Sequence, residues 1–173
     1  MDPQAPEREV LSTEWFRLIE KVVEGSAHPY YVLEAPDCVT VLALSSDGRI
    51  PLVRQYRPAL DRDSLELPSG HIDPGDASPE AAARRELLEE TGYRAEQIQL
   101  LGVIDPDVGR LRVRIYCYFA RNAVKVAPSN NDDEQIEVSD CTPGELRGLI
   151  RSGRMCHAQD LAVVLLAQLQ GVL

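Results

Sequence analysis

Three acidic residues in one short segment have the types and spacing of a metal site. Glu86 stands three residues before Glu89 and four before Glu90, so on an α-helix the three side chains would share one face. Like charges at that spacing destabilise a helix by roughly 0.2–0.5 kcal/mol per pair, and a cation on that face would remove the repulsion. Carboxylate oxygens suit Mg²⁺ or Mn²⁺. The alternative is a solvated acidic face beside neighbouring arginines.

The residues around this segment indicate how it is positioned. Ser78-Pro79 is a helix start, with serine as the cap and proline in the first turn, and Gly92 can end the helix in a left-handed conformation. A strand end and glycine turn, Leu65 to Gly70, precede the helix, followed by Asp73 to Asp76. A strand, a glycine turn and a carboxylate helix together build a pocket with backbone groups on one wall and metal on the other. This context favours the metal site over the acidic face.

The rest of the chain predicts sheet and helix in an α/β fold. We expect a loose tail over the first ten residues and a hairpin turn at Asp47-Gly48, with one apolar and one polar face on the strand that begins at Val113. The expected strands are Trp15 to Val23, Tyr30 to Leu33, Cys38 to Leu44, Ile50 to Gln55, Ile98 to Val103, Val113 to Ala120 and Ile136 to Val138. The expected closing helices are Pro143 to Arg151 and Cys156 to Gln170.

Composition narrows the class of protein. The 173 residues suit one domain with a small appendage, and the net charge of -10 argues against a general nucleic-acid binder. The N-terminus lacks the pattern of a signal peptide, and the apolar stretch Leu161 to Leu173 is too short to span a bilayer. We therefore expect a cytoplasmic protein with no membrane or nucleic-acid partner. The cysteines, which we expect to be buried free thiols, are Cys38, Cys117, Cys141 and Cys156.

The segment from Gly70 to Tyr93 resembles the Nudix box, written G-x5-E-x7-R-E-U-x-E-E-x-G-U, where U is a bulky apolar residue. Its second half matches fully, whereas Asp76 stands for the first glutamate and one extra residue lies between Asp76 and Arg85. The resemblance implies a Nudix-type α/β/α sandwich with a mixed sheet and a small N-terminal antiparallel β extension. It also implies a magnesium-dependent hydrolase, in which Arg85 orients a carboxylate by a charge-assisted hydrogen bond. The implied metal ligands are Glu86, Glu89 and Glu90, the first and last foremost.

Two further segments are similar to the ADP-ribose pyrophosphatase subgroup. Val53 to Pro58 is similar to its R-Q-Y/F-R-P stretch, and Glu66 to Gly70 resembles its E-x-P-A-G turn. The resemblance implies that Ser69 offers its backbone carbonyl to a metal. It implies a substrate-binding role for Arg57, whose guanidinium fork suits a diphosphate, and for Arg54 and Glu66. The alternative for Arg57 is a plain surface arginine.

The acidic loop Asp132 to Val138 resembles the loop and strand that carry the general base in this subgroup. Glu134 aligns best with that base and Asp132 is the alternative, while a plain solvated loop acid also fits the sequence. Chemistry requires a carboxylate beside the metals that can accept a proton from bound water. Glu137 is expected to point to solvent.

The N-terminal strands resemble the extension through which these enzymes form homodimers. We therefore divide the chain into residues 1–36, the tail and extension, and residues 37–173, the Nudix domain. Trp15 is a candidate to stack on a base, with a buried or interface tryptophan as the alternative. The predicted reaction converts ADP-ribose to AMP and ribose 5-phosphate. The alternatives are hydrolysis of GDP-mannose or another nucleotide sugar, because Ile104 to Arg110 lacks the subgroup's P-x-P-G turn, and a non-catalytic nucleotide-binding domain.

Overall fold

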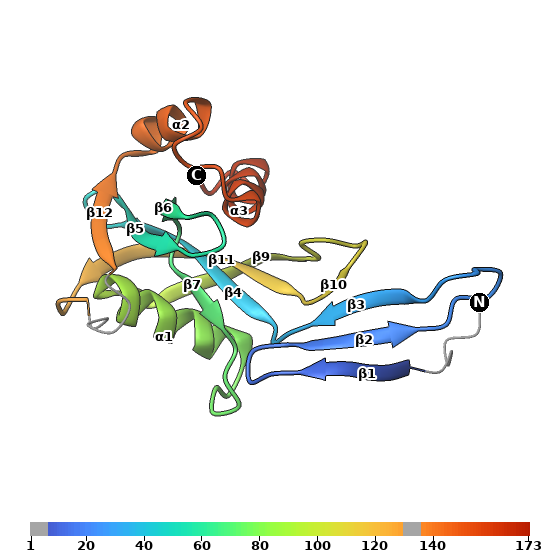
Figure 1. The fold of residues 1–173 in the computed structure, drawn as a ribbon. Coiled ribbons are helices and arrows are strands. Elements are labelled where there is room, and N and C mark those ends of the chain that lie inside the picture. Colours follow the sequence, from blue (N-terminus) through green and yellow to red (C-terminus); the bar gives the residue numbers. More distant parts are fainter. Residues whose placement is uncertain (1–6, 130–135) are drawn as a thin grey trace.

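The computed structural model describes residues 7–129 and 136–173, in which strands of three sheets come before and after the first helix and two more helices close the fold (Figure 1). The helices are α1 (Pro79–Thr91), α2 (Pro143–Arg151) and α3 (Ala158–Leu169). The strands are β1 (Glu7–Ser12), β2 (Arg17–Lys21), β3 (Tyr30–Glu34), β4 (Cys38–Ser45), β5 (Ile50–Arg57), β6 (Arg62–Glu66), β7 (Ser69–His71), β8 (Tyr93–Arg94), β9 (Gln97–Ile104), β10 (Leu111–Arg112), β11 (Ile115–Lys125) and β12 (Glu137–Cys141).

The central layer is a mixed sheet with the order β7-β4-β11-β8, in which β9 also pairs with β11. β4 and β11 run parallel, and the remaining pairs are antiparallel. Helix α1 packs on one face of this sheet, whereas α2 and α3 lie on the other side (Figure 1). The predicted α/β fold with a mixed sheet is therefore confirmed.

Two apolar clusters fill the space between these layers. Leu42, Phe119 and Leu146 belong to the cluster on the side of α2 and α3, and Val41 and Leu87 to the cluster under α1. Because β11 lies between β4 and β9 and touches helices on both sides, both of its faces are covered. The predicted polar face of this strand is therefore wrong, since Tyr118 is only 5% exposed.

The turn at Asp47-Gly48 forms as predicted but connects two different sheets. Gly48 has a φ of 78° and its N–H donates to the Ser45 carbonyl at 3.0 Å. β5 then pairs with β6 and β12 in a three-stranded antiparallel sheet, not with β4. The residues of the turn therefore predict that the chain reverses, but they do not predict the strands with which β5 pairs.

The N-terminal extension differs from its prediction in three places. Residues 7–10, expected in a loose tail, belong to β1, which pairs antiparallel with β2. Trp15 lies in the turn before β2 instead of in a strand, where the Thr13 hydroxyl accepts the Trp15 N–H at 3.1 Å. The extension sheet also includes β10 from the second half of the chain, paired parallel with β3.

Ion pairs explain why β1 forms although all of its residues are exposed. Lys21 on β2 lies 2.8 Å from Glu7, and Arg112 on β10 lies 2.8 Å from the same carboxylate. These two cations, with hydrogen bonds from both, lower the pKa of Glu7 to about 2. The polar side chains that predict a tail are thus paired with charges on other strands. A sequence pattern does not show such pairing.

The burial of the cysteines and the length of the helices can be compared with the sequence predictions. All four cysteines are free; Cys117 and Cys141 are buried as expected, but Cys38 is half-buried and Cys156 is exposed. Burial raises the pKa of the Cys117 and Cys141 thiols to about 11. Among the described residues, no helix is long and apolar enough to cross a membrane.

Candidate active site

Helix α1 carries the candidate metal ligands and has the predicted ends. The Ser78 hydroxyl accepts the Ala81 N–H at 3.1 Å and proline stands in the first turn. Gly92 adopts φ 73° and its N–H donates to the Leu88 carbonyl at 2.8 Å. Since both ends are fixed by local chemistry, the rotation of the carboxylates about the helix axis follows from their spacing.

Glu90 holds the turn that precedes the helix. Its carboxylate is 4% exposed, and Oε2 accepts the Ser69 N–H at 2.9 Å. On the other side of the turn, the Pro68 carbonyl accepts the Val41 N–H from β4 at 2.9 Å. The turn and helix are thus joined by a buried, charge-assisted hydrogen bond.

Gly70 lets the Glu86 carboxylate approach the same turn. A Cβ added at Gly70 would lie 2.1 Å from Oε1 of Glu86, closer than any real contact. The Glu86 side chain is only 12% exposed, and burial raises its pKa although Arg85 acts to lower it. The first residue of the Nudix-like segment is therefore glycine for a steric reason.

Arg85 orients the acidic residues around it. Its Nε and Nη2 donate to the two oxygens of Asp76 at 3.1 and 2.8 Å, and Nη1 donates to Glu86 at 2.7 Å and to Glu89 at 3.1 Å. The same guanidinium donates to the His71 carbonyl at 3.0 Å. These hydrogen bonds raise the pKa of Arg85, and the one from Arg85 lowers the pKa of Asp76. Asp76 thus binds Arg85 through both carboxylate oxygens, although the Nudix box has the longer glutamate at this place and one residue fewer before the arginine.

The donor set fits a magnesium ion held together with water and phosphate oxygens. Glu86 and Glu90 both lie against the Ser69-Gly70 turn, whereas Glu89 is 45% exposed and contacts Arg85. Within residues 7–129 and 136–173, no three His, Cys, Asp or Glu side chains converge as a metal-binding group. Mg²⁺ is usually held by one or two carboxylates plus water and phosphate. Two carboxylates beside a backbone turn therefore meet its requirements.

Arg57 and Glu66 form a bidentate pair next to this turn. Arg57 Nε and Nη2 donate to Oε1 and Oε2 of Glu66 at 2.9 and 2.5 Å. Burial acts to raise the pKa of Glu66, which is 2% exposed, but hydrogen bonds from Arg57 and Ser64 hold it below its ordinary value. The Arg57 side chain is 40% exposed.

The structure does not bring Arg54 to the same place. Residues three apart on a strand face opposite sides, so Arg54 and Arg57 leave β5 in opposite directions. Arg54 pairs with Glu137 of β12 and lines a hollow beside α2. Glu137 is exposed as predicted. The other loop acids, Glu134 and Asp132, lie outside the described residues.

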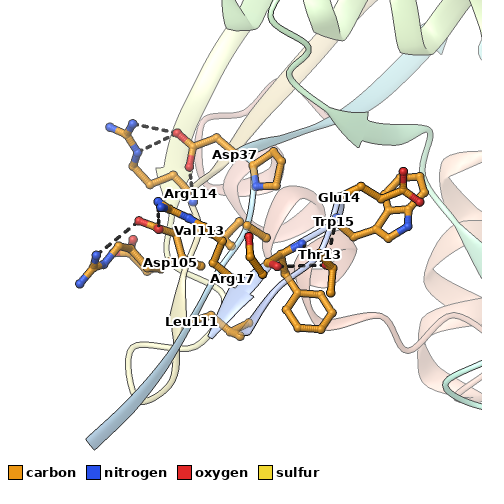
Figure 2. A pocket seen from close by; sticks show the side chains of 15 residues that line it. Thr13, Glu14, Trp15, Arg17, Asp37, Asp105, Leu111, Val113 and Arg114 are labelled. Atoms are coloured by element: carbon orange, nitrogen blue, oxygen red, sulfur yellow. Dashed lines mark hydrogen bonds and ion pairs between the residues drawn. The ribbon is translucent and has the colours of Figure 1, made fainter. Parts of the chain in front are cut away.

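Trp15 lines a pocket of about 870 Å³ between the extension and the main body. Figure 2 shows Trp15 at one end of the pocket and the Asp37–Arg114 ion pair, 2.8 Å long, at the other. The Asp37 carbonyl accepts the N–H of Ile72, just beyond β7, at 2.8 Å, so a backbone hydrogen bond joins one end of the pocket to the segment that follows Gly70. Trp15 is 64% exposed, so the alternative that this tryptophan is buried inside a single chain is wrong.

Comparison with known proteins decides the family. The NUDIX domain matches residues 35–159. The chain belongs to the NUDIX family. Members of this family generally use a divalent metal ion, and the match spans both the helix and the turn described above.

Two relatives and one solved structure show how far this NUDIX chain resembles known proteins. It is 31% identical over 151 residues to the methanol dehydrogenase activator of Bacillus methanolicus, covering 86% of this chain and 81% of that protein. It is 28% identical to the ADP-ribose pyrophosphatase of Bacillus subtilis over the same shares of both. A crystal structure of an ADP compounds hydrolase superposes with a TM-score of 0.81 at 19% identity, covering 97% of this chain and 95% of that one. The predicted family and fold are confirmed.

Sequence reasoning missed several residues of the site. Asp76 was identified only as a departure from the box, although its place in the box was a signal for its contact with Arg85. His157 and Asp160, at the start of α3, reach the Glu66-Leu67 segment. No motif marks them, and Asp160 stands 93 residues beyond Leu67 in the chain.

Proposed function

We propose that this NUDIX protein hydrolyses the diphosphate bond of a nucleoside diphosphate derivative with Mg²⁺, and that ADP-ribose is its substrate. The observation that carries the proposal is the meeting of Glu86 and Glu90 at the Ser69-Gly70 turn. The ADP-ribose pyrophosphatase relative supports the choice of substrate. Water would add to one phosphorus, and the P–O bond to the other phosphate would break, which yields AMP and ribose 5-phosphate.

The protein's own residues would divide the work as follows. Glu86, Glu90 and the Ser69 carbonyl would hold Mg²⁺, with Glu89 at the solvent side. When bound, the ion neutralises diphosphate charge and lowers the pKa of a coordinated water. Arg85 fixes the Glu86 carboxylate, since it donates to Glu86 and Asp76 at once.

Substrate groups would be oriented by residues around the turn. Arg57, itself held by Glu66, would bind the diphosphate through its guanidinium group. Glu134, with Asp132 as the alternative, would accept the proton of the attacking water. Arg54 remains a candidate on the basis of its motif alone.

The pocket that contains Trp15 suits the nucleoside. Besides Trp15, its lining includes Arg17, Arg112 and Arg114, together with the acids Glu34 and Asp37 that pair with them. An exposed tryptophan can stack on a base at roughly 1–3 kcal/mol. We further propose that residues 1–36 form the contact of a homodimer and that the enzyme acts in the cytoplasm.

A substrate panel tests the proposal. Purified protein with Mg²⁺ is assayed against ADP-ribose, GDP-mannose, other nucleotide sugars and nucleoside triphosphates, with the Glu86→Gln variant as the control. We expect the highest kcat/KM for ADP-ribose and its loss in the variant. A preference for GDP-mannose would mean that the same reaction acts on another nucleotide sugar. If no compound in the panel is hydrolysed with metal, the protein is a non-catalytic nucleotide-binding domain.

A further inference from the structure

Four ionisable side chains form a cluster between β5, β6 and the start of α3, in which two buried acids meet the partly exposed Arg57 and His157. Asp160 is completely buried and Glu66 is 2% exposed. Nδ1 of His157 lies 3.4 Å from Oδ2 of Asp160 and 4.0 Å from Oε2 of Glu66, which also binds Arg57. Two acids therefore face two groups that can carry positive charge.

Asp160 also reaches the turn that carries the candidate metal ligand. Its Oδ2 accepts the Leu67 N–H at 3.1 Å. Two residues later the Ser69 N–H donates to Glu90, and between them the Pro68 carbonyl accepts the Val41 N–H. The backbone at residues 67, 68 and 69 is thus held in succession from α3, β4 and α1.

A second contact from α3 holds the strand beneath the turn. Gln159 Nε2 donates to the Thr40 hydroxyl at 2.5 Å, and Thr40 is the register partner of Ser69 in the pairing of β4 with β7. The first turn of α3 therefore contacts the Ser69 segment through the turn itself and through its neighbouring strand.

Capping of α3 alone does not account for these residues. His157 is the N-cap residue but makes no side-chain cap hydrogen bond, and Asp160 bonds a distant backbone N–H. Among the described residues, Nδ1 of His157 and Oδ1 of Asp160 are buried without a hydrogen-bond partner. Such an arrangement is costly for stability, which is expected where a fixed geometry is needed.

We propose that Asp160 and His157 are positioning residues for the proposed reaction: Asp160 fixes the Leu67–Ser69 backbone, and His157 couples that contact to Glu66 and Arg57. The metal-binding turn and the diphosphate-binding arginine are thereby held by one cluster. Asp160 is completely buried and acts through the backbone that it binds, and this role rests on the proposed function.

Hydrogen exchange and kinetics together test the proposal. Asp160→Leu removes the acceptor for the Leu67 N–H, Asp160→Asn keeps it, and His157→Gln removes the group that joins the two acids. Gln170→Ala is the matched control, because Gln170 bonds the Leu101 carbonyl from the other end of α3 at 2.7 Å.

For Asp160→Leu we expect amide exchange over residues 67–70 to rise at least about 10-fold. We also expect kcat to fall by about 10–100-fold, as for partners that orient metal ligands, and the Mg²⁺ concentration for half-maximal rate to increase, with little change in KM. Asp160→Asn should restore exchange and kcat to within about 3-fold of wild type, and His157→Gln should lie between. The control should match wild type.

Wild-type exchange at residues 67–70 in Asp160→Leu would overturn the proposal, and so would an equal rise throughout the chain. If Asp160→Leu does not fold, His157→Gln and Asp160→Asn decide: unchanged exchange in His157→Gln, or loss of protection in Asp160→Asn, would refute it. If wild-type protein hydrolyses no member of the panel, the proposed function fails. The comparison of amide exchange between wild type and the variants, made with and without Mg²⁺, still tests the positioning role.

Discussion

Replacing Gly70 by alanine tests whether the position of Glu86 controls activity. The added Cβ would meet Oε1 of Glu86 at 2.1 Å, Cδ at 2.3 Å and Oε2 at 2.6 Å. To reach the 3.4 Å at which ordinary contacts begin, Oε1 must withdraw by about 1.3 Å. Because these atoms are the end of a flexible side chain, the carboxylate moves and the backbone stays.

A displacement of about 1 Å at a catalytic group costs on the order of 100-fold in rate, or about 2.7 kcal/mol of transition-state stabilisation. We therefore expect Gly70→Ala to lower kcat/KM about 100-fold and to raise the Mg²⁺ concentration needed for half-maximal rate. Gly75→Ala is the matched control, because a Cβ there meets nothing within 4 Å. It should stay within about twofold of wild type.

Steady-state kinetics over a Mg²⁺ series and thermal unfolding measure both consequences. The reasoning is refuted if Gly70→Ala keeps wild-type kcat/KM and Mg²⁺ dependence. A fall in melting temperature far beyond that of Gly75→Ala would also refute it, because the backbone and not the carboxylate would then have given way.

Four further outcomes are expected. Glu86→Gln should abolish nearly all hydrolysis with an unchanged circular dichroism spectrum; retention of most activity would contradict a metal role. Arg85→Lys should lower kcat/KM about 10–100-fold, since one ammonium cannot replace a fork that binds Asp76 and Glu86; equal kinetics would show that charge alone suffices. The Asp160 carboxylate, whose Oδ2 lies 3.4 Å from Nδ1 of His157, raises the pKa of His157 against the effect of burial, while Glu66 also raises it and Arg57 lowers it. The stability that protonated His157 adds is thus present below its ordinary pKa of about 6.5 and lost as pH rises through the raised value, so the difference in melting temperature between wild type and His157→Gln should shrink toward alkaline pH; a constant difference would exclude this titration. Leu42→Ala in the core should cost about 2–5 kcal/mol in urea unfolding, against less than about 0.5 kcal/mol for exposed Leu169→Ala.

The sequence alone was sufficient for the features that depend on local chemistry. The cap at Ser78, the left-handed Gly92 and the spacing of Glu86 and Glu90 all act within one helix, so they predict its ends and its acidic face. α2 begins and ends at the predicted residues for the same reason. Its capping box joins Thr142 and Glu145, three residues apart.

Features that join distant segments could not be read from the pattern. The glutamates of β1 pair with cations on β2 and β10, and β5 pairs with β6 and β12 instead of with β4. Similarly, Arg54 and Arg57 belong to one motif, but their side chains lie on opposite sides of β5 and bind different partners.

The sequence by itself determined the family, the carboxylate helix and the glycine turn, because each is written within a few consecutive residues. Only the tertiary structure decided which groups hold them in place. Asp76 meets Arg85 across a loop, and Asp160 meets Leu67 across 93 residues. Such contacts depend on how helices and sheets pack, and no local spacing encodes that packing.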